Sequence, residues 1–123
     1  MDKEQALHSY FSGFGLTAYD ENTVPDDAMA KNNGHYLTYS VSVSGFDHPQ
    51  LMSVSLWYMS TSWAAITAKA SEIFNALGEG GAIVPYLGGA AWFKRGTPFA
   101  QRMGDEDDAI RRIYINIEVE YLS

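Results

Sequence analysis

Hydrophobic and polar residues alternate in three stretches of the chain, at 35–46, 51–59 and 110–122. This period of two is typical of a β-strand with one buried face. The expected buried face consists of Leu37, Tyr39, Val41, Val43, Met52, Val54, Leu56, Tyr58, Ile113, Ile115, Ile117, Val119 and Tyr121. The last stretch alternates over the greatest length and predicts a long central strand. The first two, separated by a turn at 45–49, predict an antiparallel hairpin.

Two other stretches have the spacing of amphipathic helices. Residues 3–13 place small and apolar side chains at helical intervals before Gly13 and Gly15, which should end the helix. Residues 63–77 follow Ser62, a suitable N-cap, and end before 78–81, a glycine-rich segment. The apolar stripe of this second helix consists of Trp63, Ile66, Ala70, Ile73, Phe74 and Leu77.

The remaining segments are shorter or less regular. Residues 16–19 predict a short strand, and 20–34 predict a loop because they are rich in Asp, Asn, Pro and Ala. Residues 82–87 and 90–95 predict a second hairpin that turns at Gly88 and Gly89. Residues 96–109 predict a polar connection that leads to the last strand.

Together these elements predict a single α+β domain spanning residues 1–123. The expected order is helix, hairpin, helix, hairpin, long strand, which favours a mostly antiparallel sheet with helices packed on one face. The helix at 63–77 should pack on the sheet through Ile66, Ala70, Ile73 and Phe74. A chain of 123 residues can bury enough apolar surface to fold without disulfides or metal.

Composition narrows the classes of function. The formal net charge is −7, and the clustered cations Lys94, Arg95, Arg102, Arg111 and Arg112 flank the acidic run at 105–108. Binding to the outside of a nucleic acid is therefore not expected, because phosphate contacts need an uncompensated basic patch. The sequence contains no cysteine, which agrees with a reducing compartment. It shows neither a signal peptide nor an apolar segment of about 18 residues that could span a membrane.

Three features of the sequence could suggest a phosphate or metal site, and each has a simpler interpretation. The glycines at 78–81 follow a helix, whereas a phosphate loop must precede one, so a helix C-cap is favoured. The acidic run at 105–108 lacks the ligand spacing of a calcium loop and predicts a solvated loop. His8, His35 and His48 are far apart and lack metal-ligand spacing.

Acid–base and nucleophilic catalysis also lack a signature. Glu118 and Glu120 lie two residues apart and could form an acid pair, but an exposed or subunit-interface strand face is the favoured interpretation. No Gly-x-Ser-x-Gly segment is present. We therefore expect no enzyme activity, no cofactor and no metal site.

Aromatic residues and arginines concentrate in the second half of the chain. Trp57, Trp92 and Tyr114 fall on the polar faces of their strands, where they form either an interaction surface or a core under a second layer. Arginines near the acidic run could pair with carboxylates of a neighbouring subunit. The predicted interface consists of Trp92, Arg95, Phe99, Arg102, Asp105, Asp107, Arg111, Arg112 and Tyr114.

Three segments resemble a known group of proteins. They are 62–70 (SWAAITAKA), 95–102 (RGTPFAQR) and 110–118 (IRRIYINIE). This pattern is similar to small tail proteins encoded by prophages of Gram-positive, Clostridia-like bacteria. The order of elements also resembles the tail terminators of long-tailed phages, and the resemblance covers most of the chain from residue 5 onward.

The resemblance implies a structural subunit without catalytic residues. Tail terminators form a ring, usually a hexamer, that ends the tail tube and contacts the head–tail connector. The implied partners are further copies of the chain, the tail-tube protein and the connector, in the virion tail and in the host cytoplasm during assembly. DNA would pass only through the lumen, and no membrane would be contacted. A head–tail joining (neck) protein, and a ligand-binding or enzymatic domain with a pocket between helix 63–77 and the sheet, remain as alternatives.

Overall fold

The computed structural model describes residues 2–40, 50–104 and 107–122. In these residues the chain forms α1 (Lys3–Ser12), β1 (Ala18–Asp20), α2 (Ala28–Lys31), β2 (His35–Tyr39), β3 (Gln50–Met59), α3 (Ala64–Leu77), β4 (Ala82–Tyr86), β5 (Gly89–Met103) and β6 (Ile110–Leu122). The strands make one sheet in the order β1-β2-β3-β6-β5-β4. All neighbours are antiparallel except β1 and β2, which are parallel. The predicted α+β class with a mostly antiparallel sheet is confirmed.

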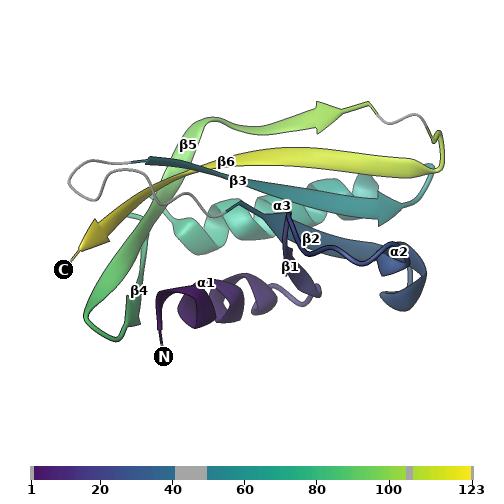
Figure 1. Cartoon of the computed structure of the whole chain (residues 1–123). Helices are drawn as coiled ribbons and strands as arrows, with labels where there is room; N and C mark the ends of the chain where they lie inside the picture. Colours follow the sequence, from purple (N-terminus) through teal and green to yellow (C-terminus); the bar gives the residue numbers. More distant parts are fainter. Residues whose placement is uncertain (1, 41–49, 105–106, 123) are drawn as a thin grey trace.

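The sheet curls over α1 and α3, which lie on its concave side (Figure 1). One continuous core fills the space between them, and it takes alternate side chains from the long strands. From β6 these are Ile113, Ile115, Ile117, Val119 and Tyr121, as the alternation predicts. The position of β6 between β3 and β5 makes it central, which confirms the interpretation of the last strand.

Helix α1 begins at a capping box. The Asp2 carboxylate accepts a hydrogen bond from the Gln5 amide nitrogen at 2.8 Å, and the Gln5 side chain accepts one from the Asp2 amide nitrogen at 3.0 Å. These bonds satisfy donors that the first turn of a helix leaves free. The helix ends at Gly13 and buries Leu7 and Phe11 against the sheet. The helix predicted at 3–13 is confirmed.

Helix α3 differs from its prediction at two residues. Its N-cap is Trp63 rather than Ser62, although the Ser62 hydroxyl accepts a hydrogen bond from the Ala64 amide nitrogen at 3.1 Å. Ile66, Ala70, Ile73 and Leu77 are buried, but Phe74 is 36% exposed. Successive helical residues point about 100° apart, so Ile73 and Phe74 cannot both face the centre of the sheet. Phe74 instead reaches the edge of the sheet at β5.

The elements in the N-terminal half of the sheet agree only in part with those that the sequence predicts. The predicted strand at 16–19 appears as β1, displaced by one to two residues. The expected loop at 20–34 contains α2, a helix of only four residues that is too short to show a helical period. The predicted strand at 35–46 is β2 over 35–39; Val41, Val43 and the turn at 45–49 lie outside the described residues.

The connection predicted at 96–109 is wrong over its first part, because β5 continues to Met103. The register against β6 shifts between Arg95 and Ala100, where a bulge interrupts the ladder. A side chain at Gly96 would place its Cβ 2.5 Å from the Asn116 carbonyl oxygen, so only glycine fits there. The Asn116 amide donates to the Pro98 carbonyl at 2.9 Å and holds the bulge. Polar, exposed residues after the bulge hid this half of the strand from the sequence pattern.

Replacing Ile73 by alanine should lower the free energy of unfolding by about 2–5 kcal/mol, because its side chain is fully buried between α3 and the sheet. The matched control is Ile83→Ala on β4, where the isoleucine is 61% exposed and the loss should stay below about 1 kcal/mol. Urea unfolding followed by circular dichroism measures both. Equal losses at the two positions would contradict the packing of α3.

The Tyr10 hydroxyl is buried and has no hydrogen-bond partner among the described residues, and burial raises its pKa. Tyr10→Phe should therefore keep or raise the free energy of unfolding, since removing an unsatisfied buried hydroxyl carries little cost. Because its folded-state pKa is raised, Tyr10 contributes to the free energy of unfolding below about pH 10, and this contribution is lost as the pH rises further. Between about pH 9.5 and 11, the free energy of unfolding should therefore fall less for Tyr10→Phe than for the unchanged protein. Parallel pH dependence of both proteins would contradict the role of this group.

Candidate interaction surfaces

The convex face of the sheet, which the described helices leave uncovered, carries a stack of aromatic and cationic groups. Tyr36 of β2 stacks on Trp57 of β3, with ring centroids 5.9 Å apart and planes 12° from parallel. The Arg112 guanidinium of β6 lies 4.4 Å from the Trp57 ring centre and donates to the Ser55 hydroxyl at 3.1 Å. The Trp57 indole donates to the Thr38 hydroxyl at 3.0 Å. These contacts fix the rings in place, and we call this set the convex stack.

The same face continues toward the other end of β6 with a second cation. Lys94 lies 3.8 Å from the Trp92 ring centre and pairs with Glu120 at 3.3 Å and Glu118 at 3.9 Å. The Trp92 indole donates to the Gly80 carbonyl at 2.8 Å. Glu118 and Glu120 thus lie on a partly exposed strand face around one lysine. This arrangement supports the strand-face interpretation over an acid pair in a cleft.

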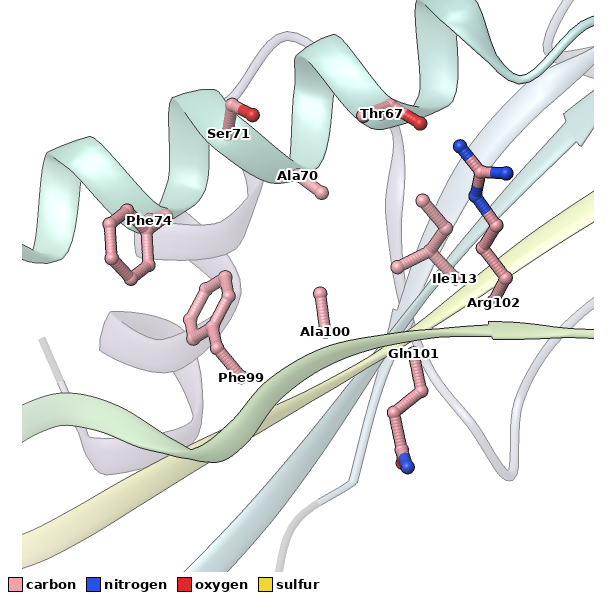
Figure 2. Close-up of a pocket in the computed structure, with 9 residues that line it drawn as sticks. All are labelled: Thr67, Ala70, Ser71, Phe74, Phe99, Ala100, Gln101, Arg102 and Ile113. Atoms are coloured by element: carbon pink, nitrogen blue, oxygen red, sulfur yellow. The ribbon is translucent and has the colours of Figure 1, made fainter.

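On the concave side, a cleft of about 250 Å³ opens between α3 and β5 (Figure 2). Its walls are mainly apolar. Phe74 of α3 and Phe99 of β5 meet edge to face with centroids 5.1 Å apart. The residues that line the cleft are Thr67, Ala70, Ser71, Phe74, Phe99, Ala100, Gln101, Arg102 and Ile113. Figure 2 shows Ala100 and Arg102 pointing toward α3 and Gln101 pointing away from it.

Arginines surround this cleft. The Arg95 guanidinium lies 3.4 Å from the Phe74 ring centre, and its Nε donates to the Phe74 carbonyl at 3.0 Å. Arg102 lies 4.7 Å from the Trp63 ring centre at the other end of the cleft. Arg111 contacts the same indole at 5.3 Å and donates to the Thr61 carbonyl at 3.0 Å. Three guanidinium groups are therefore held on aromatic rings at one edge of the molecule.

The structure divides the residues of the predicted interface between two faces. Trp92, Arg112 and Tyr114 belong to the convex face, whereas Arg95, Phe99, Arg102 and Arg111 surround the cleft on the other. Asp107 holds a turn, since its carboxylate accepts from the Ala109 amide nitrogen at 2.9 Å. Asp105 lies outside the described residues. Closeness in the sequence could not reveal this division, because alternate residues of a strand point to opposite faces of the sheet.

Four aromatic residues of these surfaces were absent from the predicted interface, namely Tyr36, Trp57, Trp63 and Phe74. Trp57 anchors the convex stack and Phe74 forms one wall of the cleft. The sequence could have indicated a surface role for Trp57, because this residue lies on the polar face of an alternating strand. No sequence pattern could have indicated such a role for Phe74, since its position on the apolar stripe of the helix is that of a core residue.

The histidines do not converge. His8 makes a hydrogen bond with the Ala18 carbonyl at 3.2 Å, and His35 stacks on Tyr58 with centroids 5.3 Å apart. His48 lies outside the described residues. A second hollow, of about 610 Å³, contains His8, Glu4 and Asp20 beside Tyr39, whose pKa is raised by burial and then by the two carboxylates. Among residues 2–40, 50–104 and 107–122, no three His, Asp or Glu side chains are grouped to hold a metal ion.

Comparisons with known proteins give the class of fold. No protein-family model and no curated protein matches the sequence. Among solved structures, a chain of the "Virion of native gene transfer agent (GTA) particle" superposes with a TM-score of 0.59 over 98% of this chain and 91% of that chain, at 20% identity. The two proteins therefore share an α+β fold over nearly their whole lengths. Within the part of the chain that the structure describes, no helix could cross a membrane.

A chelator should leave the melting temperature unchanged, because the described residues offer no metal ligand cluster. Differential scanning calorimetry with and without EDTA measures this. A drop of several degrees, reversed by one added divalent metal, would contradict the expectation and indicate a site that includes residues outside the described ranges.

Proposed function

We propose that this protein is a structural subunit of a phage-like virion. The observation that carries the proposal is the fold shared, over nearly the full length of both chains, with a chain of a gene transfer agent virion. The protein would then act through its surfaces.

Within that class, the proposed role is that of a tail terminator. This role requires a ring that ends the tail tube and contacts the head connector. A ring forms through head-to-tail contacts between two different surfaces of each subunit. The cleft would be one of these two surfaces. The convex stack lies on the opposite side of the sheet and is a separate surface with aromatic anchors. In a ring of six copies closed through the cleft, the convex face would remain free for the tube or the connector.

The acidic net charge of the chain is compatible with a ring through which DNA passes. Each chain has a formal charge of −7, so a ring of six copies would carry 6 × −7 = −42. Acidic walls repel phosphates, so DNA could pass without being held. The proposed location is accordingly the virion tail, and the host cytoplasm during assembly.

Two other functions would use the same surfaces. A head–tail joining protein would use them for contacts in the neck of the virion, farther from the tail tube than a terminator. A small ligand-binding domain would use the cleft, whose volume of about 250 Å³ approaches the lower end of the range for small-molecule sites. The cleft has an apolar lining that suits a protein side chain as well as a small ligand, and the fold likeness favours the virion role.

Deletion of the gene from its phage or prophage separates the first two roles. Loss of a terminator should give tails of irregular and excessive length that do not join heads. Loss of a neck protein should give tails of normal length beside separate filled heads. Electron microscopy of the induced particles measures tail length and joining, and normal infectious particles would contradict both roles.

A double change on the convex face tests its part in assembly. Trp92→Ala with Arg112→Glu removes one aromatic anchor and reverses the charge over the Trp57 ring. Interface anchors of this kind contribute about 2 kcal/mol or more, so the variant should reduce joined particles by at least about tenfold. Ile83→Ala, an exposed position on β4, is the matched control. Uniform tails that join heads at the normal yield would exclude a role for this face.

A further inference from the structure

The C-terminal half of β5 has a free edge beside the cleft. Strand β4 pairs only with residues 89–93 of β5, and β6 occupies the other side. Within the described part of the chain, no strand or loop makes backbone hydrogen bonds to the outer edge of residues 100–103. A polypeptide that enters the cleft would find N–H and C=O groups along this edge. A small apolar ligand could not use them.

The electrostatics of the cleft specify the polypeptide further. The cleft lies between Arg95 and Arg102, and neither forms an ion pair with a carboxylate of the described residues. Phe74, Phe99 and Ala70 form an apolar floor between the two cations. The complementary partner is an acidic segment that contains a compact apolar side chain.

A segment with this composition lies at the opposite end of the same sheet. Residues 20–27 contain Asp20, Glu21, Asp26 and Asp27 and no cation, with Val24 and Pro25 between them. Glu21, Asp26 and Asp27 are exposed and form no ion pair with a described residue. Lys31 follows in α2 and reduces the local charge without neutralising it. This segment connects β1 to α2, at the far edge of the sheet from β5 (Figure 1).

We infer that the cleft between α3 and β5 of one copy receives residues 20–27 of the next copy. Val24 and Pro25 pack on the apolar surface beside Phe74 and Phe99, and the acidic groups meet Arg95 and Arg102. Because the two surfaces lie at opposite ends of one sheet, the contact is head-to-tail and can propagate around a ring. The inference rests on the proposed ring, and it gives the exposed carboxylates of the segment 20–27 a partner in the neighbouring copy.

Cysteine trapping tests the contact directly, because the chain contains no cysteine of its own. The two probes are Asn22→Cys in the acidic segment and Ala100→Cys at the cleft, both at exposed positions. A chain with both changes, packaged into particles and treated with a short bis-maleimide, should give a ladder of covalent oligomers. Its yield should exceed by at least about tenfold that of a control with Leu51→Cys in place of Asn22→Cys, since only held groups have a high effective concentration. Leu51 is 69% exposed on β3.

A charge exchange gives an independent readout. Arg102→Glu should weaken the cross-linked yield at least about tenfold, because it places like charges at the contact. Adding Glu21→Arg and Asp26→Arg to the same chain should restore most of the yield. These side chains form no ion pair with a described residue, so a merely structural effect would not be rescued.

The outcomes separate this inference from the proposed function. If the protein is present in particles with tails of normal length but the probes at positions 22 and 100 do not link, the contact is wrong and the virion role stands. A link from position 100 to a different virion protein also overturns the contact. If the protein is absent from purified particles, the proposed function itself fails.

Discussion

The pairing of β6 with long strands on both sides is the interaction on which the rest of the structure depends. Its ten-residue ladder with β3 and its interrupted ladder with β5 hold the sheet together across its middle. The same strand supplies the buried isoleucines against which α3 packs and the half-buried arginine of the convex stack. Because side chains alternate along a strand, one run of residues fixes both the core and the outer surface.

The long elements could be predicted because their periods repeat enough to be read from the sequence. The strand at 110–122 and the helix at 63–77 each show several periods of burial, and both appear within a residue or two of the expected bounds. Helix α2 has a single turn and the exposed end of β5 has no apolar alternation, so neither has a local signal. Their conformation is set by neighbours: β6 for the strand, and the turn beside β2 for the helix.

The surfaces were predictable in composition but not in arrangement. Aromatic residues and arginines are concentrated in the second half of the chain, and the structure brings several of them into contact. Which of them share a face depends on the register of β5 against β6, and the bulge before Ala100 shifts that register. The cleft depends on Phe74 lying at the border of the core, a position that the helical period of α3 does not distinguish from burial.

The bulge at 96–99 also limits what the open edge of β5 can do. A long, flat and uninterrupted edge would accept another strand along its whole length and lead to stacking of sheets without end. Here Gly96 and Pro98 break that edge, and the Asn116 amide ties the bulge to the next strand. Only the short segment beyond it stays regular, which leaves too little edge for fibre growth. The molecule can thus keep an accessible edge while the bulge limits how far another strand can pair along it.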